Sequence, residues 1–278
     1  MYSLEALLVP IQSLYLIAFG FGVIIGSFLN VYIYRFHTGK SLSGHSHCLS
    51  CGTGLRWFEL FPLLSYLALR GRCRTCGCKI PSRYFLVELC TGLLFSLSLT
   101  LTLDVIAIGL LWVIFSLLVI ITVYDLYHFI IPDSLTLILT VMVVLSIVYD
   151  FTQYPIEINV LVWQVVAALF GSAFLFFLWF ISNGTWLGFG DVKLAIPLGL
   201  LVGTEQVFSF IVLSFWVGAI ISLLIIGYLK IRRGKDSLHL NGIGLTMKSA
   251  VPFAPFLVAS CLIILLTHFN VLELFSFT

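Results

Sequence analysis

The chain has 278 residues, of which 61% are hydrophobic and 9% are charged, and its mean hydropathy is +1.15. Soluble domains are about 45–50% apolar and about 25% charged, so this composition excludes a soluble protein and indicates a polytopic membrane protein. The formal net charge of +2 says little about partners until the basic residues are located along the chain.

Apolar segments of roughly 20 residues, the length that a helix needs to cross a bilayer, recur along the chain. Helices are expected because the bilayer core accepts only helices or closed barrels, and barrel-type segments of about ten alternating residues do not occur. We predict eight spans, one of them short. They are 11–34, 84–103, 105–124, 134–149, 160–182, 191–205, 207–229 and 250–270.

The first span is too long for the core of a signal peptide, and basic residues follow it where a cleavage site would have small ones. We therefore expect it to be retained. Gly20, Gly22 and Gly26 lie near Ser27 and Asn30, and this small-residue face suits close packing against another helix.

Eight Lys and Arg residues lie in the loop 35–83 and five in the loop 230–249. Cytoplasmic loops carry an excess of basic residues, so both loops are predicted to face the cytoplasm. A chain with eight spans that begins outside places both loops inside, so the two clusters agree with one topology. Since topology accounts for the basic residues, no nucleic-acid partner is predicted.

Two Cys-x2-Cys pairs lie in the loop 35–83, with 21 residues between them. Four thiolates at such a spacing are typical of a tetrahedral zinc site, and stable disulfides are rare in the cytoplasm. The predicted zinc ligands are Cys48, Cys51, Cys73 and Cys76. Four thiolates leave no open coordination position, so we expect this zinc to fold the loop and not to catalyse a reaction.

The same cysteines have alternative interpretations. A redox dithiol is one of them. Cys78 is a spare thiol beside the second pair, and His45 or His47 could complete a mixed ligand set. Cys90 and Cys261 lie within predicted spans, where we expect them to be small apolar packing residues.

Two carboxylates stand apart from the other acidic residues, most of which lie in loops or at outer ends of spans. Asp125 ends the third predicted span and Asp191 begins the sixth, so the predicted topology places both at the cytoplasmic face. Ionisable residues within the membrane are costly and functional by default. Asp133 follows Pro132 and is interpreted as the N-cap of the fourth span, while Glu88 lies in the first turn of the second.

Asp191 belongs to the run Gly188-Phe189-Gly190-Asp191-Val192-Lys193-Leu194, where a simple helix cap is the alternative role. Two carboxyl groups held close together do not both ionise easily, so one stays protonated while the other remains a base. Such a pair activates water against a peptide carbonyl and protonates the leaving amine. The residues therefore suggest aspartic peptide hydrolysis at the membrane surface. An ion-coupled transporter using Asp125 and Asp191, and a zinc-stabilised scaffold, stay open as alternatives.

Several motifs follow one another between about residues 20 and 195. They are Gly26-Ser27-Phe28-Leu29-Asn30-Val31 with Tyr34-Arg35; the segment 55–66, then Arg70-Gly71-Arg72-Cys73 and Arg83-Tyr84 to Val87-Glu88-Leu89; and Asp125-Leu126 with Ile131-Pro132-Asp133. The last is Gly188-x-Gly190-Asp191-Val192-Lys193-Leu194. In this joint spacing the chain resembles the prepilin peptidase family, the type IV leader peptidases among the GxGD aspartic membrane peptidases.

The resemblance implies removal of the short basic leader of type IV prepilins or type II secretion pseudopilins after a glycine, on the cytoplasmic side of the bacterial inner membrane. It carries the catalytic roles onto Asp125 and Asp191, with Asp133 as the alternative for the first motif. It also implies methylation of the new N-terminus with S-adenosylmethionine. Because no glycine-rich nucleotide fingerprint of the soluble type is visible, methyl transfer rests on the resemblance alone and its residues are not assigned.

The predicted fold is an all-α polytopic membrane protein of about eight transmembrane helices, with a small cytoplasmic zinc-binding domain between the first two. We divide it into a first span at 1–34, a four-cysteine zinc domain and methyltransferase region at 35–83, and a membrane-embedded aspartic peptidase domain at 84–278. The expected partners are prepilin substrates and the lipid bilayer, and the oligomeric state is left open. We expect the apolar prepilin helix to enter between spans, zinc to hold the loop over the site, and Gly188 and Gly190 to let Asp191 swing toward Asp125.

Overall fold

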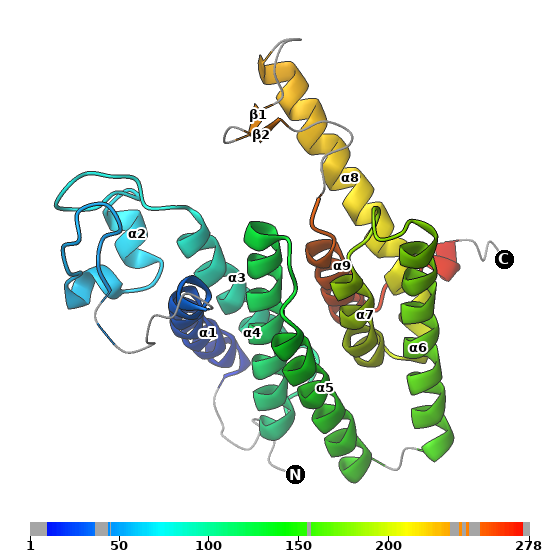
Figure 1. The fold of residues 1–278 in the computed structure, drawn as a ribbon. Coiled ribbons are helices and arrows are strands. Elements are labelled where there is room, and N and C mark those ends of the chain that lie inside the picture. The colour runs from blue at the N-terminus through cyan, green and yellow to red at the C-terminus, as the bar shows by residue number, and fades with distance from the viewer. Residues whose placement is uncertain are drawn as a thin grey trace. The chain divides into compact units, whose positions relative to one another are not determined.

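The computed structural model describes residues 10–36, 44, 46–154, 157–233, 239–240, 243–244 and 251–274. Helices dominate this part of the chain (Figure 1). Each predicted span coincides with a helix, which confirms the all-α fold class. The helices are α1 (Ile11–Arg35), α3 (Arg83–Ser98), α4 (Val105–His128), α5 (Asp133–Gln153), α6 (Ile158–Ile181), α7 (Phe189–Val202), α8 (Val207–Arg233) and α9 (Ala254–Thr267).

Five helical segments within the described residues are long and apolar enough to cross a membrane: α1, α4, α5, α6 and the segment Thr204–Tyr228, which includes most of α8. The chain is therefore a multi-pass membrane protein. Helix α3 has 16 residues, and α7 and α9 have 14 each. These are shorter than the roughly 20 residues of a perpendicular span, so the count of eight spans stays a prediction.

Short elements connect the long helices. The 3-10 helix η2 (Trp57–Leu60) and the helix α2 (Leu64–Ala68) lie between α1 and α3. Two further 3-10 turns, η3 (Thr204–Gln206) and η5 (Val271–Leu274), precede α8 and follow α9. Between α8 and α9, the strands β1 (His239–Leu240) and β2 (Ile243–Gly244) pair antiparallel, with His239 opposite Gly244.

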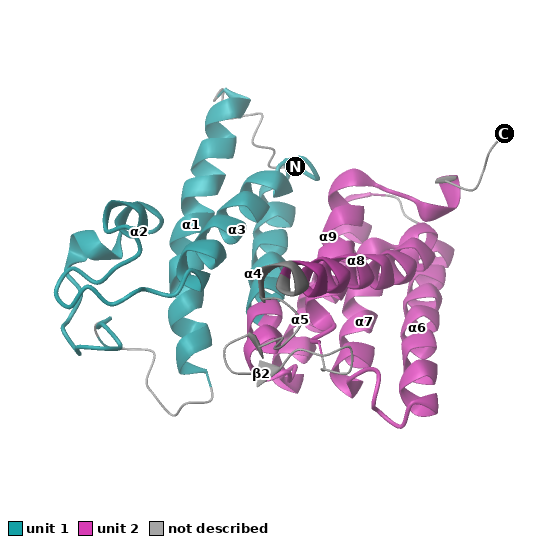
Figure 2. Cartoon of the chain, turned by 90° about the horizontal axis from the view of Figure 1, so that it is seen from above, with its two compact units in different colours: residues 1–120 teal, residues 121–278 magenta. Residues whose placement is uncertain are grey.

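The chain divides into two compact units, residues 1–120 and 121–278 (Figure 2). The boundary falls inside α4, so the first unit holds α1 to α3 with most of α4, and the second holds the last turns of α4 with α5 to α9. The predicted domains 1–34, 35–83 and 84–278 are divisions by function, and they stay a prediction.

In the first unit, α1 and α3 pack against each other through glycines. A Cβ atom placed on Gly22 would lie 2.8 Å from the Thr91 carbonyl oxygen, and one on Gly26 would lie 2.8 Å from the Glu88 Cα. Contacts this short are too close for any side chain, so the two backbones meet directly. The predicted small-residue face is confirmed for Gly22 and Gly26. Gly20 does not belong to it, because no described atom lies within 4 Å of its Cβ position.

In the second unit, α7 packs against α5, α6, α8 and α9. Gly199 lets α7 approach α6 closely, since a Cβ on it would lie 3.1 Å from the Ala168 Cα. The Ser172 hydroxyl of α6 donates a 2.8 Å hydrogen bond to the Val192 carbonyl of α7. These contacts hold the first turn of α7, which carries Asp191, in a fixed position within the unit.

Candidate active site and metal centre

Asp191 lies at the N-terminus of α7, where the helix begins after Gly188. Its Oδ2 atom accepts a 3.2 Å hydrogen bond from the Gly188 amide, so the side chain does cap the helix as the alternative interpretation proposed. The cap uses only one carboxyl oxygen. The other, Oδ1, is buried and has no hydrogen-bond partner within the described residues. A cap alone therefore does not account for Asp191.

Asp125 lies one turn before the end of α4. It accepts a hydrogen bond from the backbone amide of Ala254, the first residue of α9, so it also faces a helix N-terminus. Such ends carry unsatisfied amides and favour negative charge. Its Oδ2 atom is buried and, among the described residues, without a hydrogen-bond partner.

The two carboxyl groups form one cluster in the second unit. Asp125 is 5% exposed and Asp191 is 6% exposed, and the charge of Asp125 acts on Asp191. The hydroxyl of Thr122, one turn before Asp125, is likewise buried without a partner in the described part of the chain. Buried polar atoms in native proteins are nearly always hydrogen-bonded, so these oxygens have unused capacity to bind water or a substrate.

Gly190 lets α7 approach the start of α5. A Cβ atom on Gly190 would lie 3.1 Å from the Ile131 Cβ and 3.3 Å from its Cδ1, so a side chain there would require Ile131 to move. Ile131 is buried, and it belongs to the Ile131-Pro132-Asp133 run that follows α4. The two aspartate motifs therefore touch through Gly190 and Ile131.

Asp133 has a different role from the predicted cap. Pro132 holds the N-cap position of α5, and Asp133 is the acidic residue of the first turn without a side-chain cap bond. Its carboxylate forms a 2.8 Å ion pair with Lys193 of α7, and its side chain is 73% exposed. The prediction of an N-cap at Asp133 is wrong because the lysine two residues after Asp191 captures the carboxylate.

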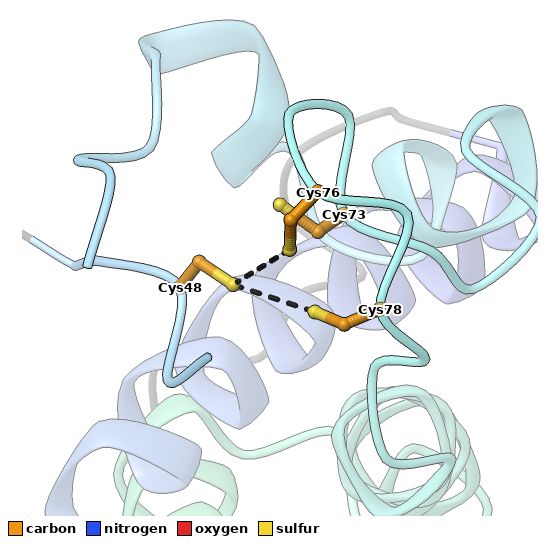
Figure 3. A group of neighbouring side chains, drawn as sticks. All are labelled: Cys48, Cys73, Cys76 and Cys78. Carbon is orange, nitrogen blue, oxygen red and sulfur yellow. Dashed lines mark hydrogen bonds between the residues drawn. The ribbon is translucent and has the colours of Figure 1, made fainter. Parts of the chain in front are cut away.

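A cluster of cysteines that could hold a metal ion lies in the first unit, and Figure 3 shows its side chains. The sulfur atoms of four cysteines all lie within 4.8 Å of one another, and these are Cys48, Cys73, Cys76 and Cys78. Three of the four predicted ligands are thus together, but Cys78 replaces Cys51 in the group. Cys51 is exposed and bonds to the Thr53 hydroxyl at 3.3 Å, and it also interacts with Cys48 and Cys76.

The thiols suit a zinc ion by their spacing. Zinc–sulfur bonds of about 2.3 Å in a tetrahedron put sulfur atoms about 3.8 Å apart. The Sγ of Cys48 lies 3.9 Å from that of Cys76 and 3.5 Å from that of Cys78.

A cavity of about 520 Å³ adjoins the cysteine cluster within the first unit. Its volume is within the range of about 300–1,000 Å³ that small-molecule pockets have. Cys48, Cys73 and Cys78 contribute to its wall, and its other sides combine aromatic, acidic and basic side chains. These include Tyr34, Tyr66, Tyr84, Glu59, Glu88, Arg35 and Arg74.

Glu88 lines this cavity and forms hydrogen bonds with the residues around it. It is buried, its Oε2 accepts a 2.8 Å hydrogen bond from the Leu63 amide, and it also bonds to Ser27 of α1. Asn30 of α1 donates a 3.0 Å bond to the Tyr84 carbonyl. Glu88 therefore fastens the loop between α1 and α3 to α3 through Leu63, while the bonds of Ser27 and Asn30 join α1 to α3.

Sequence reasoning missed the Ala254 amide, the Lys193–Asp133 ion pair and the anchoring role of Glu88. The run Pro252-Phe253-Ala254-Pro255 does signal a helix start, because proline suits the first turn of a helix. Its meeting with Asp125 is a contact across 129 residues, which no local pattern reveals. Thr122 could have been identified from the sequence, since it precedes Asp125 by three residues and therefore lies on the same face of the helix.

Comparisons with known proteins show the family of the chain. Residues 21–102 match the bacterial Peptidase A24 N-terminal domain, and residues 112–223 match the type IV leader peptidase family. A prepilin leader peptidase/N-methyltransferase of Myxococcus xanthus is 33% identical over 225 residues, covering 81% of this chain and 66% of that protein. Proteins of the same name from Aeromonas hydrophila and Legionella pneumophila are each 31% identical, covering 90% of this chain and 89% and 90% of their own lengths. No solved structure matches the chain. With both domains and these long alignments in agreement, the chain belongs to the type IV leader peptidase family.

Proposed function

We propose that this protein is an aspartic endopeptidase that removes the leader of type IV prepilins or type II secretion pseudopilins. Cleavage follows a glycine, on the cytoplasmic side of the bacterial inner membrane. Asp125 and Asp191 are the catalytic pair. The observation that carries the proposal is that both carboxyl groups are buried in one unit, each with one oxygen left without a partner among the described residues.

The chemistry divides one proton between the two carboxyl groups. The ionised member takes a proton from a water molecule, and that water attacks the scissile carbonyl carbon. The protonated member donates its proton to the leaving amine as the carbon–nitrogen bond breaks. Because the amides of Gly188 and Ala254 each hold one oxygen, the free oxygens are the ones that face the water.

The cytoplasmic location follows from the basic loops 35–83 and 230–249, which the positive-inside rule places on that side. The apolar N-terminal helix of the prepilin would lie among the spans, with its basic leader toward the same side. Membership of a peptidase family argues against the ion-coupled transporter that the aspartates alone had left open.

We also propose that the protein methylates the new N-terminus with S-adenosylmethionine, because its relatives bear the name N-methyltransferase. The cavity in the first unit lies within residues 21–102, which match the Peptidase A24 N-terminal domain, and outside residues 112–223, which carry the two aspartates. Tyrosine faces suit a purine ring and a sulfonium, carboxylates suit ribose hydroxyls, and Arg74 suits a carboxylate. When bound there, S-adenosylmethionine supplies the methyl group that the N-terminal amine accepts.

The experiment for cleavage is the intact mass of a purified prepilin incubated in detergent with the full-length protein and S-adenosylmethionine. Loss of the leader mass with the wild type, and not with Asp125→Asn or Asp191→Asn, is the expected result. Cleavage that survives both substitutions would refute the aspartic pair. Solute flux without any cleavage would favour a transporter.

Methyl transfer has its own readout in the same spectrum, a further methyl mass on the cleaved product. Equilibrium dialysis with radiolabelled S-adenosylmethionine tests the cavity without the reaction. Ser65→Trp should fill the cavity and abolish binding, whereas Leu67→Trp, on the same short helix with an exposed side chain, should not. If Ser65→Trp binds S-adenosylmethionine as well as Leu67→Trp does, this cavity is not the binding site.

A further inference from the structure

The segment 57–69, between the two cysteine pairs, arranges its side chains in the reverse of a soluble loop. Apart from Ala68, its exposed side chains are large and apolar and are between 37% and 74% exposed. They are Trp57, Phe58, Leu60, Phe61, Leu64 and Leu67. The ring centroids of Trp57 and Phe58 lie 5.7 Å apart and those of Trp57 and Phe61 lie 5.8 Å apart, so these side chains form one face. Soluble proteins rarely expose a contiguous apolar face unless it meets a partner or a membrane.

The oxygen-bearing side chains of the same segment face inward. Glu59, Ser65 and Tyr66 all line the cavity of the first unit. Glu59 is also the only charged residue between Arg56 and Arg70, and its carboxylate accepts a 2.8 Å hydrogen bond from the Arg56 amide. Polar groups that face a protein cavity while apolar groups face outward are typical of a segment surrounded by lipid.

Glu88 fixes the level of this segment along α1. The Leu63 amide donates a 2.8 Å hydrogen bond to the Glu88 carboxylate, which also bonds to Ser27 of α1. Ser27 precedes Arg35, the last residue of α1, by eight residues, which is about 12 Å of helix. Helix α1 is long and apolar enough to span a membrane, and a basic residue at its end suits the head groups. With Arg35 at the head groups, Leu63 lies within the cytoplasmic half of a hydrocarbon core about 30 Å thick.

The backbone of the segment is suited to that depth. Acyl chains offer no hydrogen bonds, so irregular backbone is tolerated there only where the protein itself satisfies its polar groups. Leu63 has a φ of 58°, which is uncommon for a bulky residue, and Glu88 binds its amide. The Leu64 amide donates to the Pro62 carbonyl at 2.6 Å, and the Leu67 amide donates to the Leu63 carbonyl at 3.1 Å. The turn before α2 therefore has acceptors for these amides within the protein.

We propose that the segment 57–69 is embedded in the cytoplasmic leaflet of the bilayer, with its six large apolar side chains among the acyl chains and with Arg56 and Arg70 at the phospholipid phosphates. Both arginines are exposed, and the Arg74 guanidinium lies 5.4 Å from the centre of the Phe58 ring, so basic groups border the apolar face. Aromatic side chains beside basic ones are typical of elements that lie in the membrane interface. Helix α2 lies beside α1, on the side away from α4 (Figure 1 and Figure 2). The loop between α1 and α3 is then held to the bilayer at its middle as well as at its two ends.

Fluorescence quenching of Trp57 tests the embedding directly. Full-length wild type and Trp57→Phe are reconstituted in vesicles of phosphatidylcholine and phosphatidylglycerol, and the difference between their emission spectra gives the Trp57 component. Brominated phospholipid should quench this component as strongly as the Trp163 component, which Trp163→Phe gives in the same way, since Trp163 is an exposed residue of the apolar helix α6. Iodide on both sides of the membrane should leave the Trp57 component unchanged.

Two other results of this experiment would overturn the proposal. Quenching by iodide and not by brominated phospholipid would place Trp57 in water. Quenching by neither reagent would mean that protein covers this face, either a second copy of the chain or another polypeptide.

Photolabelling of the unaltered protein gives an answer that does not depend on any variant. Vesicles that contain a phospholipid with a diazirine on its acyl chain are irradiated, and the tryptic peptides of the protein are analysed by mass spectrometry. Trypsin cleaves at Arg56 and Arg70 and so releases the peptide 57–70, and it releases 41–56 from the same loop as the control. Label is expected on 57–70, as on the α1 peptide 1–35, and not on 41–56. Label on 1–35 without label on 57–70, or equal label on 57–70 and 41–56, would contradict the proposal.

Discussion

Asp125 and Asp191 combine burial with incomplete hydrogen bonding, which most folded proteins avoid. Each carboxyl group accepts a hydrogen bond from one amide at the start of a helix, and its second oxygen has no partner in the described part of the chain. This arrangement lowers stability, since a buried carboxylate that lacks partners retains much of its desolvation penalty. Such a loss of stability is expected where activity requires a reactive atom that no other protein group binds.

Asp191→Asn should therefore stabilise the protein while it removes activity. The amide keeps the Gly188 contact and removes a buried charge beside Asp125, so we expect a gain of about 1 kcal/mol, which corresponds to a rise of about 2–4 °C in Tm. Thermal unfolding in detergent, followed by tryptophan fluorescence, measures it. Asp133→Asn is the control and should not raise Tm, since Asp133 is exposed and ion-paired. A lower Tm for Asp191→Asn would contradict the reasoning.

Asp133 tests the alternative assignment of the catalytic pair. Its carboxylate is largely exposed and bonds to Lys193, and pairs between exposed charges contribute about 0–1 kcal/mol. We expect Asp133→Asn to cleave prepilin within about tenfold of the wild-type rate. A loss as large as that of Asp125→Asn, in initial rates measured side by side, would mean that Asp133 takes part in the chemistry.

The aspartates could be selected from the sequence because charged residues are only 9% of the chain, so a carboxylate at the end of an apolar run is conspicuous. The hydrogen-bond and ion-pair partners of the aspartates could not be identified from the sequence. The Ala254 amide reaches Asp125 through the packing of α9, and the Asp133–Lys193 pair joins residues 60 apart. Contacts of this kind depend on tertiary packing, which local residue patterns do not encode.

At the scale of elements, glycines set the distances between helices. Gly190 and Ile131 bring the first turn of α7 against the segment before α5, and Gly26 brings α1 against α3. The sequence indicated that these glycines pack, yet only the structure separates them from Gly20, which has open space around it. The choice among glycines depends on which face of α1 meets α3.

Gly190→Val should impair cleavage by misplacing Asp191. The new side chain would press on Ile131, and a shift of about 1 Å in a catalytic group can cost about 100-fold in rate. The added variant Ile131→Ala makes room for the valine, so the double variant should regain at least about tenfold over Gly190→Val. Initial cleavage rates of both, beside Ile131→Ala alone, give the comparison. Full activity of Gly190→Val would show that close approach at this position is not needed.

Gly26→Val should destabilise the first unit. Its side chain would collide with the backbone of Glu88, and overpacking of this kind costs about 1–3 kcal/mol. The matched control is Gly20→Val on the same helix, where the Cβ position is open. Thermal unfolding should separate the two variants by several degrees. Equal Tm values would mean that α1 and α3 do not pack through this glycine face.

At the scale of the whole molecule, hydropathy located every long helix, because spans of apolar residues are the strongest pattern in this sequence. It overstated the lengths of α3, α7 and α9, which end before residues 103, 205 and 270, and α7 stops at Val202 because Gly203 follows with a φ of 88°. The loop between α1 and α3 belongs to a larger unit with both helices: Glu88 of α3 bonds to Leu63 of the loop, and Asn30 of α1 bonds to Tyr84 of α3. The motif spacing predicted a four-cysteine site but could not show that Cys78 is one of the clustered thiols.

The central claim is that Asp125 and Asp191 act as one catalytic unit, and the single-turnover rate of prepilin cleavage tests it most directly. It is measured for the wild type, Asp125→Asn, Asp191→Asn and the double variant. Each single substitution should lower the rate at least about 100-fold, and the double variant should be no slower than the slower single, since residues of one unit are non-additive. A single variant within about tenfold of the wild type, or a double loss equal to the product of the two single losses, would contradict the account.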